Sequence, residues 1–122
     1  MAKLEKSISD LMAIDGATGA AVVDISSGMA LASGGNPGFS LDAAAAGNSN
    51  VVRAKLKTMV DLELTETIDD ILITLDSQYH LINVLNDGES KGLFIYLVLS
   101  RATSNLALAR HKLRAVSSSI SL

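Results

Sequence analysis

The chain has 122 residues, a net charge of −3 and no cysteine. A chain of this length predicts a single domain over residues 1–122, and the lack of cysteine excludes disulfides, cysteine-based zinc sites and a thiol nucleophile. The weak negative charge provides no general attraction to nucleic acid. Without an apolar signal core or a run of membrane-spanning length, the sequence predicts a cytoplasmic protein with no direct membrane insertion.

The N-terminal part predicts a helix followed by a hairpin. Leu4, Ile8, Leu11 and Met12 share one helical face. Residues 17–24 are small and then β-branched, which is typical of a strand, and a glycine-containing turn at 26–28 leads to a second short strand at 29–33. The segment 34–38 is interpreted as an ordinary strand-to-helix loop, in preference to a phosphate-binding loop.

The middle segment, from Ser40 to about Leu62, contains opposing signals. Ser40 is a good N-cap, but Gly47 and its polar neighbours resemble a helix end. Large residues keep a helical period across this stretch, which favours one uninterrupted helix. A glycine in mid-helix costs about 1 kcal/mol relative to alanine, so the small residues should allow another backbone to approach closely. This small-residue set consists of Ala43, Ala46, Gly47, Asn50 and Ala54.

The C-terminal half predicts three strands and a final helix. The strands are expected at 68–75, 79–85 and 92–99, and the last of them is apolar throughout, which is typical of a central strand covered on both faces. The helix should run from about residue 102, with Arg110, Lys112 and Arg114 on its solvated face, and the serine-rich residues 117–122 are expected to fray. The order is therefore α-β-β-α-β-β-β-α, an α+β domain with an antiparallel sheet.

Motifs for catalysis and cofactor binding are not found in the sequence. It has no P-loop and no G-x-S-x-G motif. His80 shares a strand face with apolar residues, which favours a structural role, and His111 lies among cations, a poor setting for a metal ligand. The acidic residues from Asp61 to Asp70 lack the spacing of a cation-binding loop. The sequence thus predicts no catalytic residue, no cofactor and no metal.

Two features indicate binding to another protein. The strand at 68–75 lacks proline and is partly apolar, so at a sheet edge it would be exposed to pairing with a second copy. Its candidate contact residues are Ile71, Leu72, Ile73 and Thr74. The second feature is the small-residue set of the middle helix.

These features resemble the roadblock/dynein light chain family, specifically its short bacterial members, over nearly the whole chain. The residues that carry the resemblance are 15–24 and 28–32 for the first hairpin, the alanine-rich helix from Leu41, and 92–99 followed by 105–113. The resemblance implies a profilin-like architecture, with a five-stranded antiparallel sheet, the first and last helices on one face and the middle helix on the other. It also implies a homodimer in which the middle helices lie side by side and the third strands pair.

Proteins of this family commonly act as regulators or scaffolds for a small Ras-like GTPase. The resemblance therefore implies a non-enzymatic module that binds such a GTPase and modulates its hydrolysis through the partner's own catalytic residues. Arg53 and Lys57 are candidate GTPase contacts; no catalytic arginine is assigned, because Arg53 and Arg101 qualify by charge alone. One alternative is a structural scaffold of a signalling or motor-type complex without GTPase dependence. A minor alternative is a small-molecule sensor using His80, Tyr79 and Asn83, which would require a concave pocket.

Overall fold

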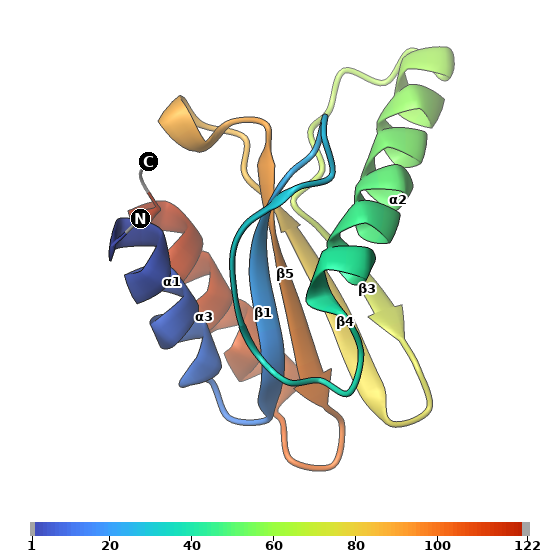
Figure 1. Ribbon diagram of the computed structural model, residues 1–122. Coiled ribbons are helices and arrows are strands. Elements are labelled where there is room, and N and C mark those ends of the chain that lie inside the picture. The colour runs from blue at the N-terminus through green and yellow to red at the C-terminus, as the bar shows by residue number, and fades with distance from the viewer. Residues whose placement is uncertain (1, 121–122) are drawn as a thin grey trace.

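The computed structural model describes residues 2–120 and has three layers. Two helices cover one face of a five-stranded sheet and a third crosses the other face (Figure 1). In chain order the elements are α1 (Ala2–Met12), β1 (Ala17–Asp24), β2 (Ala30–Gly35), α2 (Leu41–Asp61), β3 (Asp70–Thr74), β4 (Gln78–Val84), the 3₁₀ turn η1 (Gly88–Ser90), β5 (Leu93–Ser100) and α3 (Leu106–Ser119). This order and the layering confirm the fold class predicted from the sequence.

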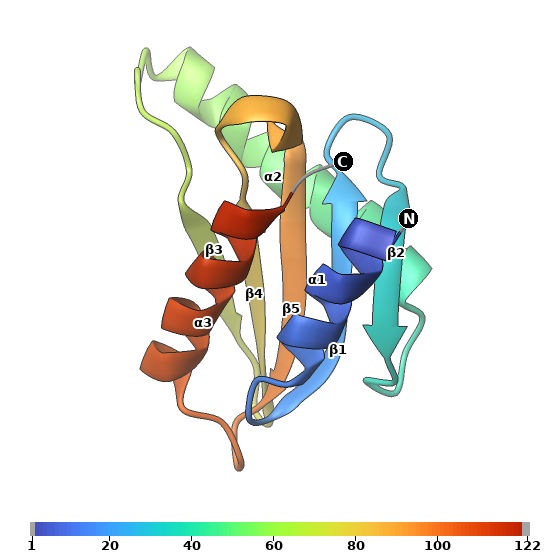
Figure 2. The same ribbon diagram turned by 90° about the vertical axis from the view of Figure 1, so that its left-hand side faces the viewer.

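The sheet has the order β2-β1-β5-β4-β3, and all neighbouring strands are antiparallel. The centre of the sheet joins an early strand to a late one, because β1 pairs with β5 in a register that places Ala21 opposite Tyr96. Figure 2 shows β2 and β3 as the two edge strands, with α1 and α3 in front of the sheet. The strand predicted to lie at an edge is therefore an edge strand.

The core has two halves that meet at β5. Seven of the eight β5 residues are buried, which agrees with the prediction of a central strand covered on both faces. Leu97 and Leu99 point toward α1 and α3, whereas Phe94, Tyr96 and Val98 point toward α2. An antiparallel strand without a polar face requires both helical layers, and the chain provides them.

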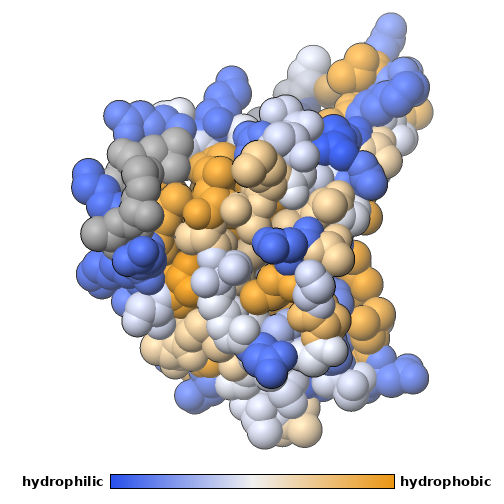
Figure 3. Space-filling model, viewed as in Figure 1, coloured by the Kyte–Doolittle hydropathy of each residue, from blue (hydrophilic) through white to orange (hydrophobic). Residues whose placement is uncertain are grey.

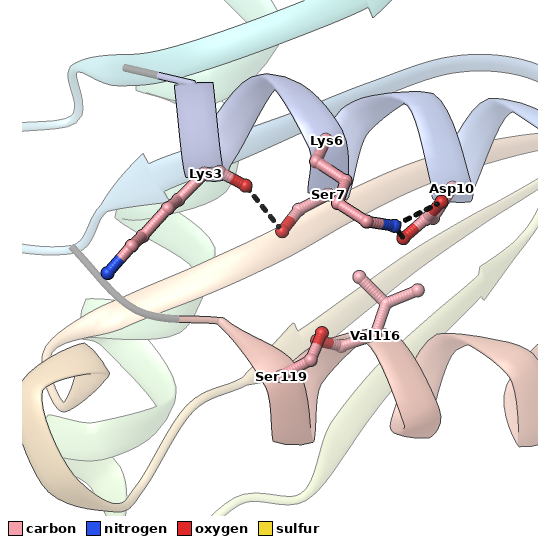
Figure 4. Close-up of polar contacts among 6 residues, drawn as sticks. All are labelled: Lys3, Lys6, Ser7, Asp10, Val116 and Ser119. Atoms are coloured by element: carbon pink, nitrogen blue, oxygen red, sulfur yellow. Dashed lines mark hydrogen bonds and ion pairs between the residues drawn. The ribbon is translucent and has the colours of Figure 1, made fainter.

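Helices α1 and α3 lie side by side on one face of the sheet (Figure 4). Ser7 of α1 is buried and donates to the Lys3 carbonyl over 3.2 Å, so its hydroxyl is satisfied within its own helix. Lys6 and Asp10, on the exposed side, form an i,i+4 ion pair at 3.0 Å. Helix α1 also lies close to Gly34 of β2. A Cβ added at Gly34 would lie only 2.6 Å from the Ile8 side chain, so this contact requires glycine.

Helix α2 is continuous through the stretch that contains Gly47. The Ser40 hydroxyl accepts from the Ala43 amide over 3.1 Å, as expected of an N-cap. At the C-terminal end of the helix, the Glu63 amide donates a hydrogen bond to the Val60 carbonyl, and the Leu64 amide donates to the Met59 carbonyl. The prediction of one helix is confirmed, and its small residues do not interrupt it.

The C-terminal end of α2 extends past the sheet. Met59 is the last buried residue of the helix, and beyond it Val60 is 73% exposed and Leu62 61% exposed. In Figure 3 this end projects at the upper right, where hydrophobic residues lie among hydrophilic ones. Among the described residues, no helix is long and apolar enough to cross a membrane.

Several boundaries differ from the sequence-based expectation. The third strand begins at Asp70 and ends at Thr74, because Ile68 is buried beside β4 as irregular chain and its carbonyl accepts from the Asn86 side chain over 2.9 Å. The second strand continues to Gly35, two residues further than predicted. The tail expected to fray from residue 117 is helical to Ser119, and Ile120 is buried; residues 121–122 lie outside the described part of the chain.

Candidate functional site: the β3 edge and the exposed side of α2

The β3 edge is half-buried and apolar. Ile71 packs toward α2, Leu72 toward the opposite core, and Ile73 pairs with His80 of β4. Thr74, the last strand residue, is exposed. Within the described chain β4 is the only strand bonded to β3, so one side of its backbone faces outward. An unpaired apolar edge without proline is open to strand addition.

All five members of the predicted small-residue set are exposed, and the fold divides them. Ala46 faces the turn between β1 and β2, where a Cβ added to Gly28 would lie 3.3 Å from the Ala46 Cα. Gly28 itself has a φ of +76°, which favours glycine. The backbone that approaches Ala46 therefore belongs to this same chain.

Ala43 and Gly47 lie on a different side of α2, next to β4 and β5. A Cβ added to Gly47 would meet no atom within 4 Å, so nothing in this chain requires glycine at that position. The space over Gly47 is open to another molecule, whereas the Gly28 turn borders Ala46 on one side.

Arg53 connects α2 to the β1–β2 turn. Its guanidinium donates to the carbonyls of Ile25 and Ser26 and to the Asn50 side chain. Asn50, predicted as an interface residue, is thus engaged in orienting Arg53. Lys57, the other candidate contact, is exposed and forms an i,i+4 ion pair with Asp61 at 2.8 Å.

Arg101 has an equivalent role at the other end of the sheet. It donates to the Leu75 carbonyl over 2.8 Å, and its guanidinium carbon lies 5.3 Å from the centre of the Tyr79 ring. Arg101 therefore holds the β3–β4 turn. Because Arg53 and Arg101 both serve hairpin turns, neither side chain is free in this structure to reach another protein.

The position of Arg110 corrects the expectation of a solvated face on α3. Its Nε donates to Asp70 Oδ2 over 3.1 Å and a terminal nitrogen donates to Oδ1 over 3.3 Å. Both side chains are partly buried. The sequence could not predict this pair, because the two residues are forty positions apart and meet only once β3 and α3 pack.

Sequence reasoning also missed a polar cluster beneath α2. The Tyr96 hydroxyl lies 3.0 Å from His80 Nδ1, and His80 Nε2 lies 2.7 Å from Gln78 Oε1. The Asn48 side chain hydrogen-bonds to the same hydroxyl. Because Gln78 Oε1 accepts, Nε2 carries the proton and Nδ1 accepts from tyrosine. The alternation of residues along β4 and β5 could have indicated this cluster, but only once the register between the two strands was known.

Burial shifts the protonation of two members of this cluster. It lowers the pKa of His80, since the charged imidazolium loses solvation. It raises the pKa of Tyr96 to about 12, against the smaller opposing effect of the Asn48 hydrogen bond. At neutral pH the cluster is therefore uncharged.

The sensor residues considered from the sequence do not come together. His80 faces α2, whereas Tyr79 packs on the opposite core and Asn83 lines a different cavity beside Arg114. Among residues 2–120, no three histidine, aspartate or glutamate side chains gather in a way that could hold a metal ion.

The fold of this chain is similar to that of roadblock domains in solved structures. A Roadblock/LC7 domain from Streptomyces avermitilis superposes with a TM-score of 0.79 at 16% identity, covering 93% of this chain and 91% of that one. MglB of Myxococcus xanthus superposes with a TM-score of 0.83 at 14% identity, covering 97% and 84%. An MglB described in a tetrameric arrangement has a TM-score of 0.77 at 14% identity, covering 96% and 86%.

At these identities the likeness establishes the fold, and it confirms the resemblance noted from the sequence at that level. No protein-family model matches the sequence, and no curated protein matches it.

Proposed function

We propose that this protein is a cytoplasmic, non-enzymatic module that forms a homodimer and binds a small Ras-like GTPase as its regulator or scaffold. The observation that carries the proposal is the combination of an unpaired apolar β3 edge with an open small-residue surface on α2, both at the same side of a roadblock-type domain. Neither feature is explained by packing within the chain.

Self-association would join the β3 strands of two copies. Antiparallel pairing of two β3 edges extends the sheet across both copies, satisfies the outward backbone groups and covers Ile71 and Ile73. A two-fold axis at this position would bring the two α2 helices together on one face. The tetrameric arrangement described for an MglB supports a fold that assembles with itself.

The fold refines which α2 residues would meet the second copy. Ala46 and Asn50 already serve the β1–β2 turn and its arginine, so they are unsuitable as contacts. Ala43, Gly47 and Ala54 are exposed and would allow close approach of a second helix. In the proposal, these three residues replace the full small-residue set as contacts with the second copy.

Binding of a GTPase is supported by the resemblance to the roadblock family. Since Arg53 and Arg101 hold hairpin turns, the proposal assigns no arginine to the partner's active site. Any effect on hydrolysis would come from ordering the partner's own catalytic residues. Lys57, exposed on α2, remains the candidate contact.

The self-association surface can be tested with Gly47→Arg. Because no atom lies within 4 Å of a Cβ at this position, the variant should fold as a monomer and lose association. Ala115→Arg, at an exposed position of α3, is the matched control and should associate normally. Sedimentation equilibrium at micromolar concentration gives the masses. A stable monomer in the unmodified protein, or an unchanged mass for Gly47→Arg, would contradict the proposed surface.

The β3 edge has its own variant, Ile73→Lys. A charge on a half-buried edge strand should block strand addition, and the circular dichroism spectrum of the monomer should stay unchanged. Loss of association by Gly47→Arg alone would limit the interface to the helices.

The GTPase proposal is tested by affinity in two nucleotide states. A Ras-like GTPase encoded beside this protein is the first partner to try, loaded with GDP or with a non-hydrolysable GTP analogue. Regulation requires different affinities for the two states, because a ligand that binds both equally shifts neither. Equal affinities would leave a scaffold, and no binding would favour the scaffold without GTPase dependence.

A further inference from the structure

A polar cavity of about 510 Å³ lies between the C-terminal part of α3 and the end of β4. Figure 2 shows α3 in front of β4 on this face, with α2 behind the sheet. None of the residues proposed for self-association, on α2 and along β3, lines the cavity. Of the lining residues only Asp69 lies next to β3, and its carbonyl accepts from the Val84 amide over 3.0 Å, toward β4. The cavity is therefore separate from the surface assigned to a second copy.

Asn83 is a buried polar residue that the fold leaves without a partner. Residues alternate along β4, so Asn83 shares the face of Leu81, which packs in the core beneath α1 and α3. Asn83 is only 8% exposed, and no hydrogen bond joins its side-chain amide to any described residue. Buried amides are normally paired, because an unpaired one loses its hydration without compensation. Since Asn83 lines the cavity, its two N–H donors and its carbonyl oxygen are available to a ligand there.

The cavity also holds charges of both signs that do not pair with each other. The Arg114 guanidinium makes no hydrogen bond or ion pair with a described residue, whereas Arg110, one turn earlier on α3, is held by Asp70. Asp69, before β3, and Asp87, after β4, contribute carboxylates to the lining. Neither carboxylate forms an ion pair with Arg114, which leaves space between the opposite charges for a molecule that carries both.

These charges select a class of ligand. A phosphate or a dicarboxylate would find one cation but would be repelled by two carboxylates, and a simple amine would be repelled by the guanidinium. A zwitterion satisfies both signs at once. A ligand carboxylate can accept two parallel N–H bonds from a guanidinium, and an adjacent ammonium can donate to the aspartates. The α-carbon of a free amino acid bears this pair of groups.

The remaining polar groups of the cavity are hydrogen-bond acceptors. Asn86 Nδ2 already donates to the Ile68 carbonyl over 2.9 Å, which leaves the Asn86 Oδ1 to accept. The hydroxyls of Ser117 and Ser118 both donate to the Arg114 carbonyl, over 2.8 and 3.0 Å, so that their lone pairs remain. Acceptors of this kind match an uncharged N–H donor such as a carboxamide and would repel a second carboxylate.

We propose that this cavity binds a free α-amino acid with an uncharged, carboxamide-type side chain. The α-carboxylate lies on Arg114 and Asn83, and the α-ammonium lies on Asp69 and Asp87. The volume of the cavity is in the range of small-molecule sites. The site goes beyond the proposed function and does not depend on it, because it lies on the face of the sheet opposite α2.

L-Glutamine is the probe. In a ¹H–¹⁵N correlation titration of the full chain, millimolar L-glutamine should shift the backbone amides of Asn83, Asp87 and Arg114 saturably. Three analogues test the three groups of the ligand: glutaramate lacks the α-ammonium, γ-aminobutyramide lacks the α-carboxylate, and L-glutamate replaces the carboxamide by a carboxylate. Each analogue should bind at least tenfold more weakly than L-glutamine.

Two variants remove the groups that carry the proposal. Arg114→Gln should weaken L-glutamine at least tenfold, since it removes a charge-assisted contact. Asn83→Leu should weaken it roughly tenfold, the equivalent of one hydrogen bond. Because the Asn83 amide has no partner in the chain, Asn83→Leu should not lower the urea midpoint of unfolding, whereas loss of a structural hydrogen bond would lower it. Lys112→Gln, an exposed change of the same charge on the same helix but outside the cavity, is the matched control and should bind normally.

The absence of a saturable shift, equal binding of any of the three analogues, or unchanged affinity in Arg114→Gln would overturn the proposal. A lower urea midpoint for Asn83→Leu would also overturn it, because the amide would then have a structural partner. Sedimentation equilibrium of Arg114→Gln should give the mass of the unmodified protein. The outcome of the titration is therefore distinguishable from the outcome of the self-association experiments.

Discussion

Arg110 of α3 and Asp70 of β3 form a two-point ion pair, with Nε and Oδ2 3.1 Å apart. This pair links the edge strand to a helix on the far side of the core. Because β3 has a single strand neighbour within the described chain, the ion pair is its main polar attachment besides β4.

We expect Arg110→Ala to destabilise the protein by about 1 kcal/mol, because the partly buried Asp70 carboxylate loses a charge-assisted partner. Urea unfolding of Arg110→Ala, Asp70→Asn and the double variant gives the coupling energy. The control is the exposed Lys57–Asp61 pair, which should couple by less than about 0.5 kcal/mol. An equal coupling energy for the Arg110–Asp70 and Lys57–Asp61 pairs would show that partial burial does not strengthen the Arg110–Asp70 ion pair.

Replacing Arg53 by alanine should loosen the β1–β2 turn. Two turn carbonyls, those of Ile25 and Ser26, lose their donor, and the cost should be about 1–2 kcal/mol. Arg53→Lys should recover only part of the lost stability, since the lysine ammonium lacks the planar set of N–H donors that a guanidinium presents to two carbonyls. Hydrogen exchange at Gly28 and Met29 locates the change, and unaltered exchange there would assign Arg53 to another role.

Glu63→Gly should stabilise the protein by about 0.5–1 kcal/mol. Glu63 is the one non-glycine residue with positive φ among the described residues, at 59°, where it closes the end of α2. A side chain in this region costs about 1–2 kcal/mol, which glycine avoids at some expense in unfolded-state entropy. Glu66→Gly, in the exposed connection to β3, is the control and should give no gain in thermal unfolding.

Acidification should destabilise the protein through His80. Its folded-state pKa is lowered by burial, so the unfolded chain takes up a proton first. The stability is fully present above the ordinary histidine pKa of about 6.5 and falls as the pH drops through that value. Urea unfolding from pH 8 to 5 should show this loss, and His80→Phe should flatten it relative to His111→Phe, an exposed control. An identical slope in both variants would contradict the assignment to His80.

Most of the fold could be predicted because it depends on short-range pattern. The apolar run of β5 indicated a strand covered on both faces, and the helical period of α2 predicted continuity through Gly47. The edge position of β3 also came from the resemblance and is confirmed by the strand order.

The roles of individual side chains were harder to predict because they depend on tertiary contacts. Arg53 and Arg101 were grouped by charge, but each meets carbonyls more than twenty residues away in sequence. His80 and Tyr96 share a face only through the register that places His80 opposite Val98. Ala46 is small because the Gly28 turn approaches it, a contact that no local pattern encodes.

The pairing of β1 with β5 has a consequence for how this chain acquires its structure. Ala17 lies opposite Leu99, so the middle of the sheet joins segments that are widely separated in sequence. Loop-closure entropy must be overcome before these contacts contribute, which predicts slow folding relative to a helical bundle of equal size. During synthesis, β1 and β2 emerge as a hairpin whose inner edge stays unpaired until residues 93–100 leave the ribosome. Folding of this domain is therefore a late event, completed only after residues 93–100 have been made.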